Sequence, residues 1–291
     1  MSCKMRRSLF FASALWSLAL LGWLTACGGD GDGGSNQTSD NVRYELPRPK
    51  KSGNTYMLSH YTSEGLNYTV EWDIDKKSQR WTAYQMDPTY QGSAGRAGDF
   101  MEDPELPKEY RLDDTYSYYR GSGFTRGHIC PSADRQYSVE ANRQTFYYTN
   151  MQPQYYNFNA GDNYGSPWVR LENLVRTWAK SNANEKLYVV KGGTIEDDQL
   201  LTTIKGGLRV PKYFFVAVVK KQVNGWHYGI GFWMLHENRE YTGQEPLTDY
   251  LVNIRELERK TGIDFFYQFP DDIEEPMETQ KVENIKKVWN L

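Results

Sequence analysis

The chain has 291 residues, and its 34 lysine and arginine residues against 37 aspartate and glutamate residues give a formal net charge of −3 at pH 7. This balance does not by itself indicate a nucleic-acid-binding protein, because such proteins concentrate basic residues. The three cysteines are too few for a disulfide framework or a cysteine-rich zinc site. A core of ordinary apolar packing is expected instead, since the chain has 22 tyrosines, 12 phenylalanines and 9 tryptophans.

The first residues have the pattern of an export signal. Lys4, Arg6 and Arg7 precede an almost uncharged apolar run over residues 9–24, as in a secretory signal peptide. The run ends in LTAC, a small-residue cleavage site that resembles the lipobox of bacterial lipoproteins and places Cys27 directly after it. The alternative is a transmembrane anchor that is never cleaved, although the run is short for spanning a bilayer.

These features predict a signal peptide over residues 1–26 and a membrane attachment through lipid on Cys27. Cys3 would leave with the signal, so Cys130 would lack a partner for an intramolecular disulfide. The residue after Cys27 is Gly28 and not the aspartate associated with inner-membrane retention. This favours an exported lipoprotein of the outer membrane, facing the periplasm or the cell surface.

The segment GGDGDGGSNQTSDN follows Cys27 and has too few apolar residues to form a core, so residues 27–41 are predicted to be a flexible, lipid-anchored tether. One catalytic domain is expected over residues 42–291. Removal of the signal would leave 31 basic and 37 acidic residues, a formal charge of −6. Binding of a nucleic-acid substrate therefore requires a local concentration of basic residues. Residues 120–180 meet this requirement, with seven basic and four acidic residues.

Several aromatic or β-branched runs predict strands of an antiparallel sheet. Residues 67–84 give two strands around an Asp-Lys-Lys-Ser turn, and residues 102–112 give a proline-containing loop. Residues 187–190, 213–219 and 226–235 give further strands separated by glycine-rich or Asn-Gly turns.

Helical spacing is present in three places. Apolar residues recur at that spacing from Trp168 to Trp178, a second helix is predicted over residues 247–259 ahead of Gly262, and a third over residues 282–289. No internal repeat or nucleotide-binding glycine loop is found. The expected fold class is α+β, with an antiparallel sheet core and few helices.

The residues with the most chemical capability lie between 124 and 176. Gly127 permits a tight backbone path beside His128, Pro131 interrupts any strand after it, and residues 145–149 are predicted to form a second strand. A polar loop rich in asparagine and the helix that begins near Trp168 follow. Two strands and a helix, with a histidine and nearby amides, could hold a base and a metal ion.

Hydrolysis of a phosphodiester needs an activated water, a metal ion and cations that stabilise charge on phosphorus. His128 can accept a proton from water, because imidazole is an efficient base near neutral pH. Asn159 can offer a carbonyl oxygen to Mg²⁺, a cation that keeps most of its waters. Arg126, Arg176 and the more distant Arg96 can bind phosphate.

This segment resembles the DNA/RNA non-specific endonuclease family, the ββα-metal nucleases, whose pattern is Asp-Arg-Gly-His followed by Asn and then Asn, Trp, Glu and Arg. The matching segments are TRGH at 125–128, NMQPQ at 150–154, FNAG at 158–161 and WVRLE at 168–172, with Arg176 at the end. The similarity extends over about residues 60–266, including ERKTGIDFF at 258–266.

The resemblance implies His128 as general base and Asn159 as the direct Mg²⁺ ligand, with Mn²⁺ as a candidate substitute. It also implies that Asn150 orients His128 or the site and that Glu172 holds water bound to the metal. Arg176 would stabilise the transition state, and Arg96 in GRAGDF matches the family's upstream arginine. Arg126 belongs to the TRGH segment itself.

Two departures and two alternatives accompany this match. Thr125 replaces the usual aspartate, and six extra residues at 162–167 precede the helix. Asn157 and Asn163 compete with Asn159 as metal ligand, and Glu172 with Arg176 could form an ordinary i,i+4 surface ion pair. The remaining histidines are interpreted as structural: His60, His227 and His236.

The leading functional hypothesis is a magnesium-dependent endonuclease that hydrolyses DNA and RNA with little sequence preference, because contacts to phosphate and sugar carry no sequence information. DNA and RNA are the expected partners, together with the membrane, and no obligate protein partner is predicted. A second hypothesis is a surface binding module for glycans or a protein on an inactivated nuclease fold. A nuclease toxin with an inhibitor is a third.

Overall fold

The computed structural model describes residues 42–51, 53–90, 92–112, 115–182 and 185–291. The predicted signal peptide over residues 1–26 and the predicted tether over residues 27–41 lie outside the described residues. In the described part of the chain, no helix is long and apolar enough to span a membrane.

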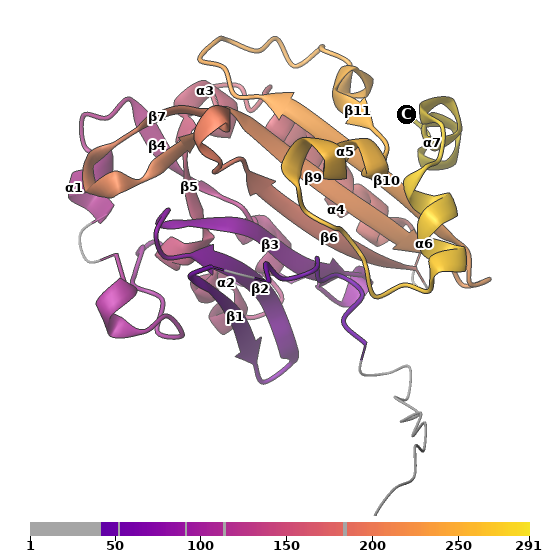
Figure 1. Cartoon of the computed structure of the whole chain (residues 1–291), viewed down its shortest axis with the longest axis horizontal. Coiled ribbons are helices and arrows are strands. Elements are labelled where there is room, and N and C mark those ends of the chain that lie inside the picture. Colours follow the sequence, from indigo (N-terminus) through magenta and orange to yellow (C-terminus); the bar gives the residue numbers. More distant parts are fainter. Residues whose placement is uncertain (1–41, 52, 91, 113–114, 183–184) are drawn as a thin grey trace, which may run out of the picture. The chain divides into compact units, whose positions relative to one another are not determined.

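The centre of the domain is a seven-stranded antiparallel sheet with the strand order β1-β2-β3-β6-β9-β10-β11 (Figure 1). Its strands are β1 Thr55–Thr62, β2 Gly65–Asp73, β3 Ser78–Met86, β6 Lys186–Gly193, β9 Tyr213–Lys221, β10 His227–Leu235 and β11 Leu251–Val252. Two small antiparallel pairs accompany it: β4 Phe124–His128 with β5 Met151–Tyr155, and β7 Leu200–Thr203 with β8 Arg209–Pro211. The predicted hairpin and the three later strands are confirmed.

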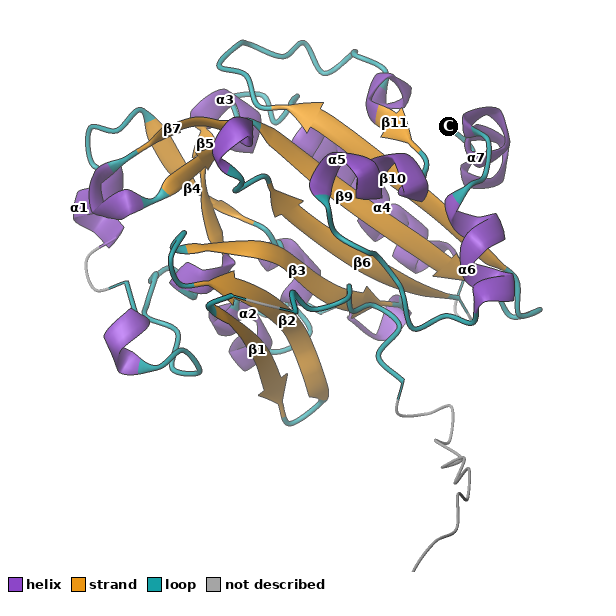
Figure 2. Ribbon diagram, viewed as in Figure 1, coloured by secondary structure: helices purple, strands orange, loops and turns teal. Residues whose placement is uncertain are grey.

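Seven helices are present among the described residues: α1 Thr115–Tyr119, α2 Val139–Gln144, α3 Tyr156–Asn159, α4 Pro167–Ser181, α5 Ile254–Thr261, α6 Asp271–Glu278 and α7 Val282–Trp289. They cover both faces of the sheet, with α5 on the near face and α4 behind it in Figure 2.

Successive side chains of β9 point to opposite faces of the sheet and so join two different cores. Phe214, Val216 and Val218 join the core beneath α4, and the intervening residues join the core beneath α5 and α6.

The helix predicted over residues 247–259 is wrong in its first half. A 3₁₀ turn over Leu247–Tyr250 and the short strand β11 occupy that half, and α5 begins after Asn253. The Asn253 side chain accepts a hydrogen bond from the Glu256 amide at 2.8 Å, which caps the helix. Gly262 ends α5 with φ of 66°, as the sequence suggested. The helices predicted around Trp168 and over residues 282–289 are confirmed as α4 and α7.

The strand predicted over residues 145–149 is also wrong. These residues follow α2 and enter a 3₁₀ turn over Tyr148–Asn150, and the strand that pairs with β4 is β5. Thr145 favours the turn because its hydroxyl donates to the Asn142 carbonyl at 2.6 Å. Pro153 lies within β5, where it is tolerated because a two-stranded pair has free edges at which a missing N–H costs little.

Two acidic side chains on α5 and α6 make stability depend on pH. Glu278 is 1% exposed, and its Oε2 lies 2.7 Å from Arg255, whereas its Oε1 has no hydrogen-bond partner among the described residues. Burial raises the pKa of Glu278 to about 8 and that of nearby Glu258 to about 7. The folded state therefore holds protons that the unfolded chain releases above a pKa of 4.5.

This stabilisation is complete below pH 4.5 and is lost as the pH rises through 7 and 8. We therefore expect these two groups to lower the melting temperature by several degrees between pH 5.5 and pH 8.5, where about 2–4 °C corresponds to 1 kcal/mol in a domain of this size. His128 and His236, whose pKa values are lowered, act in the opposite direction below about pH 6.5, so the effect of the glutamates is measured as the difference between the wild type and a Glu278 variant. Glu278→Gln should flatten this slope in thermal denaturation curves. Glu275→Gln is the control, because Glu275 is exposed and contacts the same Arg255. An unchanged slope in Glu278→Gln would contradict the assignment.

Candidate active site

The site is built around the short β4–β5 pair. Antiparallel pairing sets His128 opposite Met151 and Gly127 opposite Gln152. A Cβ atom at position 127 would lie 2.2 Å from the side-chain carbon Cδ of Gln154. Glycine is therefore required at position 127 by close packing, as the tight path beside His128 suggested.

His128, at the end of β4, has a half-buried ring packed between two phenylalanines. Its ring centroid lies 4.8 Å from that of Phe146 in an edge-on arrangement and 5.8 Å from that of Phe100. Its Nε2 atom is buried and has no hydrogen-bond partner among the described residues. Burial, together with the charges of Arg96, Lys191 and Arg126, lowers the pKa of His128 to about 3. The imidazole is therefore neutral near pH 7 and able to accept a proton.

Arg96 and Arg126 both lie beside His128, and each stacks on one of its flanking rings. The guanidinium carbon of Arg126 is 4.0 Å from the Phe100 ring centroid, and that of Arg96 is 4.9 Å from the Phe146 centroid. Such stacking restrains a flexible side chain without neutralising its charge. The two predicted phosphate-binding arginines thus gather at the predicted base.

Asn150 is fully buried and supports the backbone just after His128. Its side chain accepts from the Cys130 amide at 2.8 Å and donates to the Cys130 and Thr145 carbonyls at 2.9 and 2.8 Å. Its own carbonyl also accepts from the Ile129 amide at 3.0 Å. Asn150 therefore fixes the end of β4, and its hydrogen bonds connect it to the neighbours of His128 rather than to the ring.

Asn159 ends α3 and turns its amide toward β4. Its Nδ2 donates to Thr125 Oγ1 at 3.0 Å, and the same hydroxyl donates to the Gln154 carbonyl at 3.1 Å. Among the described residues no group donates to Asn159 Oδ1, and the side chain is half-buried. The carbonyl end of the amide is thus available to a cation, and the threonine that replaces the usual aspartate fixes its orientation.

The competing asparagines are less suited. Asn163 uses both ends of its amide, because Nδ2 donates to the Tyr241 carbonyl at 2.9 Å and Oδ1 accepts from the Gly165 amide at 2.8 Å. Asn157 lies on α3 but has no contact with Thr125 or β4 among the bonds of the described residues. The six extra residues lead into α4, where the Ser166 side chain caps the helix by accepting from the Val169 amide.

Glu172 and Arg176 on α4 point toward the interior and do not pair with each other. Glu172 Oε1 lies 2.8 Å from the Nζ atom of Lys191 on β6, and Arg176 NH1 lies 2.6 Å from Oδ1 of buried Asp134. Burial raises the pKa of Glu172, an effect that Lys191 opposes. The surface ion pair considered from the sequence is therefore wrong: each side chain has its own buried partner. Sequence reasoning missed Lys191 and Asp134, since neither belongs to a local motif.

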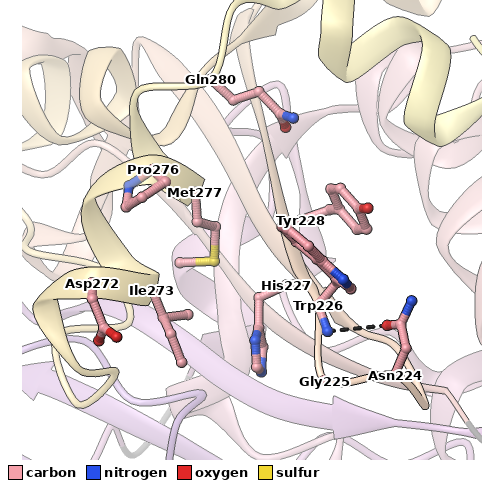
Figure 3. A pocket seen from close by; sticks show the side chains of 10 residues that line it. All are labelled: Asn224, Gly225, Trp226, His227, Tyr228, Asp272, Ile273, Pro276, Met277 and Gln280. Atoms are coloured by element: carbon pink, nitrogen blue, oxygen red, sulfur yellow. Dashed lines mark hydrogen bonds between the residues drawn. The ribbon is translucent and has the colours of Figure 1, made fainter.

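Of two hollows in the surface, one is lined by a predicted site residue and the other is not. One of about 260 Å³ borders Arg176 and Asp134 and includes Lys180. Another of about 330 Å³ lies between β10 and α6, and its lining includes Trp226, Met277 and Gln280 (Figure 3). The second contains none of the predicted site residues, and the first contains Arg176 alone of them.

The other histidines occupy structural environments. His236 is buried, with Nδ1 2.8 Å from the Pro211 carbonyl, and its Nε2 accepts from the Tyr155 amide at 2.8 Å. His60 is buried with Nε2 3.2 Å from Asp103. Among the described residues, no group of three or more histidine, cysteine, aspartate or glutamate side chains is placed to hold a metal ion. A cation here would depend on an amide oxygen and water.

Known proteins are similar to this chain in sequence. A family model described as DNA/RNA non-specific endonuclease matches residues 50–272. The chain is 32% identical to a protein named Nuclease from Nostoc sp. over 226 residues, covering 75% of this chain and 77% of that protein. It is 31% identical to the mitochondrial Nuclease EXOG of Xenopus laevis over 219 residues, covering 71% of this chain and 58% of that protein.

A solved structure agrees with the fold. A chain in the crystal structure of the EndoG/EndoGI complex aligns with a TM-score of 0.63 at 22% identity, over 77% of this chain and 91% of that chain. This likeness confirms the α+β fold class with an antiparallel core.

Proposed function

The chain belongs to the DNA/RNA non-specific endonuclease family, and from this membership we propose that it is a metal-dependent endonuclease hydrolysing phosphodiester bonds in DNA and RNA with little sequence preference. Membership makes the chain a nuclease and a hydrolase. The observation that carries the finer proposal is the placement of neutral His128, the Asn159 amide and two arginines on or beside β4.

In this proposal His128 accepts the proton of the attacking water. Arg96 and Arg126 lower the pKa of His128. The negative charge of a bound phosphate would oppose this effect and raise the pKa, so that the imidazole takes up a proton more readily as the reaction proceeds. Both guanidinium groups bind phosphate oxygens, and Arg176 stabilises the charge that develops on them. Contacts of this kind do not read base identity, so little sequence preference is expected.

The proposed metal is Mg²⁺, with Mn²⁺ as a substitute, and the residues present fit it. The oriented Asn159 carbonyl supplies one hard oxygen ligand, and water would fill the other positions, with Glu172 accepting hydrogen bonds from that water. When bound, the metal would neutralise charge on the phosphate and on the leaving oxygen.

The experiment that tests the proposed activity is digestion of supercoiled plasmid and total RNA by the purified full chain. Both substrates should be cut with Mg²⁺ and remain intact with EDTA. Intact substrates from a protein with a normal thermal transition in Mg²⁺ would contradict the proposal and favour a binding role.

Thr125 provides a further prediction. Thr125→Val removes the hydroxyl that accepts from Asn159 and donates to Gln154, so the amide can rotate. We expect a loss of about 10- to 100-fold in activity or in apparent Mg²⁺ affinity, the usual effect of removing an outer partner of a metal ligand. Thr125→Ser keeps the hydroxyl and should remain within a few-fold of the wild type in the same Mg²⁺ titration. Equal activity of the two variants would show that the hydroxyl is unimportant.

We also propose export as an outer-membrane lipoprotein with the lipid on Cys27, on the basis of the sequence pattern. Cells expressing the full chain should incorporate labelled palmitate into it, and Cys27→Ser should abolish that labelling. Labelling that persists in Cys27→Ser would contradict this proposal.

A further inference from the structure

Lys191 is a buried lysine in the middle of a central strand. It is 2% exposed, and its strand β6 lies between β3 and β9, where it pairs with Thr82 and Val216. A lysine is rarely placed in such a position without a partner for its charge. The residue that binds the ammonium of Lys191 therefore indicates the role of this lysine.

The ammonium of Lys191 reaches α4 and contacts two residues one helical turn apart. Its Nζ is 2.8 Å from Glu172 Oε1 and 4.1 Å from the centroid of the Trp168 ring. The indole therefore restrains the ammonium from one side, and the carboxylate binds it from another. The other oxygen of Glu172, Oε2, accepts no hydrogen bond from the described residues.

Lys191 also acts on the base, because its charge is one of the three that face His128. The charges that face Glu172 are Lys191, Arg176 and Asp134. A purely structural link between the sheet and α4 would not need an ion pair, since a well-packed apolar pair of similar volume is often as stable. Because the charge of Lys191 also acts on His128, the pair can serve the reaction as well as the fold.

We propose that Lys191 is a positioning residue for the nuclease reaction: it binds Glu172 Oε1 over the Trp168 ring and so directs Oε2 to the water around the metal. The inference rests on the proposed function of the site. It gives a role to a residue outside the TRGH and asparagine motifs.

Three variants of the full chain test this role. Lys191→Met removes the charge at similar length, and Lys191→Arg keeps a charge that can bind the carboxylate. Lys220→Met is the matched control, since Lys220 on the adjacent strand β9 stacks on Trp289 at 4.7 Å, away from the site. The readouts are kcat, KM for nucleic acid, and the Mg²⁺ concentration that gives half of the Mg²⁺-dependent thermal shift without nucleic acid.

Lys191→Met should lower kcat by about 10- to 100-fold, with KM changed less than kcat, and should raise the half-saturating Mg²⁺ concentration. Lys191→Arg should recover part of both losses, and Lys220→Met should match the wild type. A folded Lys191→Met with wild-type kcat and Mg²⁺ dependence would overturn the proposal.

A double variant keeps the test decisive if Lys191→Met does not fold. Glu172→Gln with Lys191→Met removes both charges together, so no buried charge is left alone. If Lys191 acts through Glu172, the double variant should be within a few-fold of Glu172→Gln in activity, whereas a further loss of 10-fold or more would overturn the proposal. A wild type that cuts no nucleic acid would instead contradict the nuclease function, and the Mg²⁺ thermal shift would still report on Lys191.

Discussion

Replacing His128 by alanine is expected to reduce kcat for plasmid and RNA cleavage by about 10²- to 10⁴-fold, the usual contribution of a general base. The structure supports this size of effect because the imidazole is neutral near pH 7 and no other histidine lies in the cluster among the described residues. KM for nucleic acid should change little, since Arg96 and Arg126 remain to bind phosphate.

His227→Ala is the matched control for this substitution. His227 borders the hollow between β10 and α6, and its ring packs on Phe269 at 4.8 Å, so its loss should leave kcat unchanged. Thermal denaturation of both variants separates loss of the base from loss of the fold. A folded His128→Ala with kcat within a few-fold of the wild type would exclude His128 as the base.

Replacing Asn159 by alanine is expected to raise the Mg²⁺ concentration needed for half-maximal cleavage. The increase should exceed the factor of about 10 to 100 that is typical when a residue supporting a metal ligand is removed. The reason is that, in the proposed site, the carbonyl oxygen of Asn159 binds the cation while Thr125 holds the nitrogen of the same amide. Activity at saturating Mg²⁺ should also fall, because the ion would no longer be held at one place relative to His128.

Asn157→Ala tests the specificity of that effect. Asn157 lies on the same short helix and was a competing ligand in the sequence, so its removal should leave the Mg²⁺ dependence of cleavage unchanged. A Mg²⁺ titration in which Asn157→Ala is the defective variant and Asn159→Ala is normal would reverse the assignment.

Much of the fold follows from local patterns in the sequence. The apolar run of β9 predicted a strand because both faces of the sheet are covered, and the spacing from Trp168 to Trp178 predicted α4 because one side of that helix is buried. The misplaced strand at 145–149 has a physical cause. Thr145 and Asn150 bind nearby backbone groups and stabilise a turn, which outweighs the strand propensity of the aromatic residues between them.

The candidate site was predictable as far as its motif extends. His128, Arg126 and Asn159 belong to short segments that match the family pattern, and the pairing of β4 with β5, which α3 follows directly, brings these segments together. The charged partners were not predictable in the same way. Lys191 and Asp134 lie outside the matching segments, and their contacts with Glu172 and Arg176 depend on how β6 and the turn over Ser132–Arg135 pack against α4.

Chemical rescue of His128→Ala tests the central claim most directly. Supercoiled plasmid and total RNA would be incubated with the wild type and with His128→Ala, in Mg²⁺ or EDTA, with and without imidazole. We expect the wild type to cut both substrates only when Mg²⁺ is available, and the variant to be nearly inactive until imidazole supplies the missing base. A wild type that leaves both substrates intact, or a folded variant that cuts as fast as the wild type without imidazole, would contradict the account.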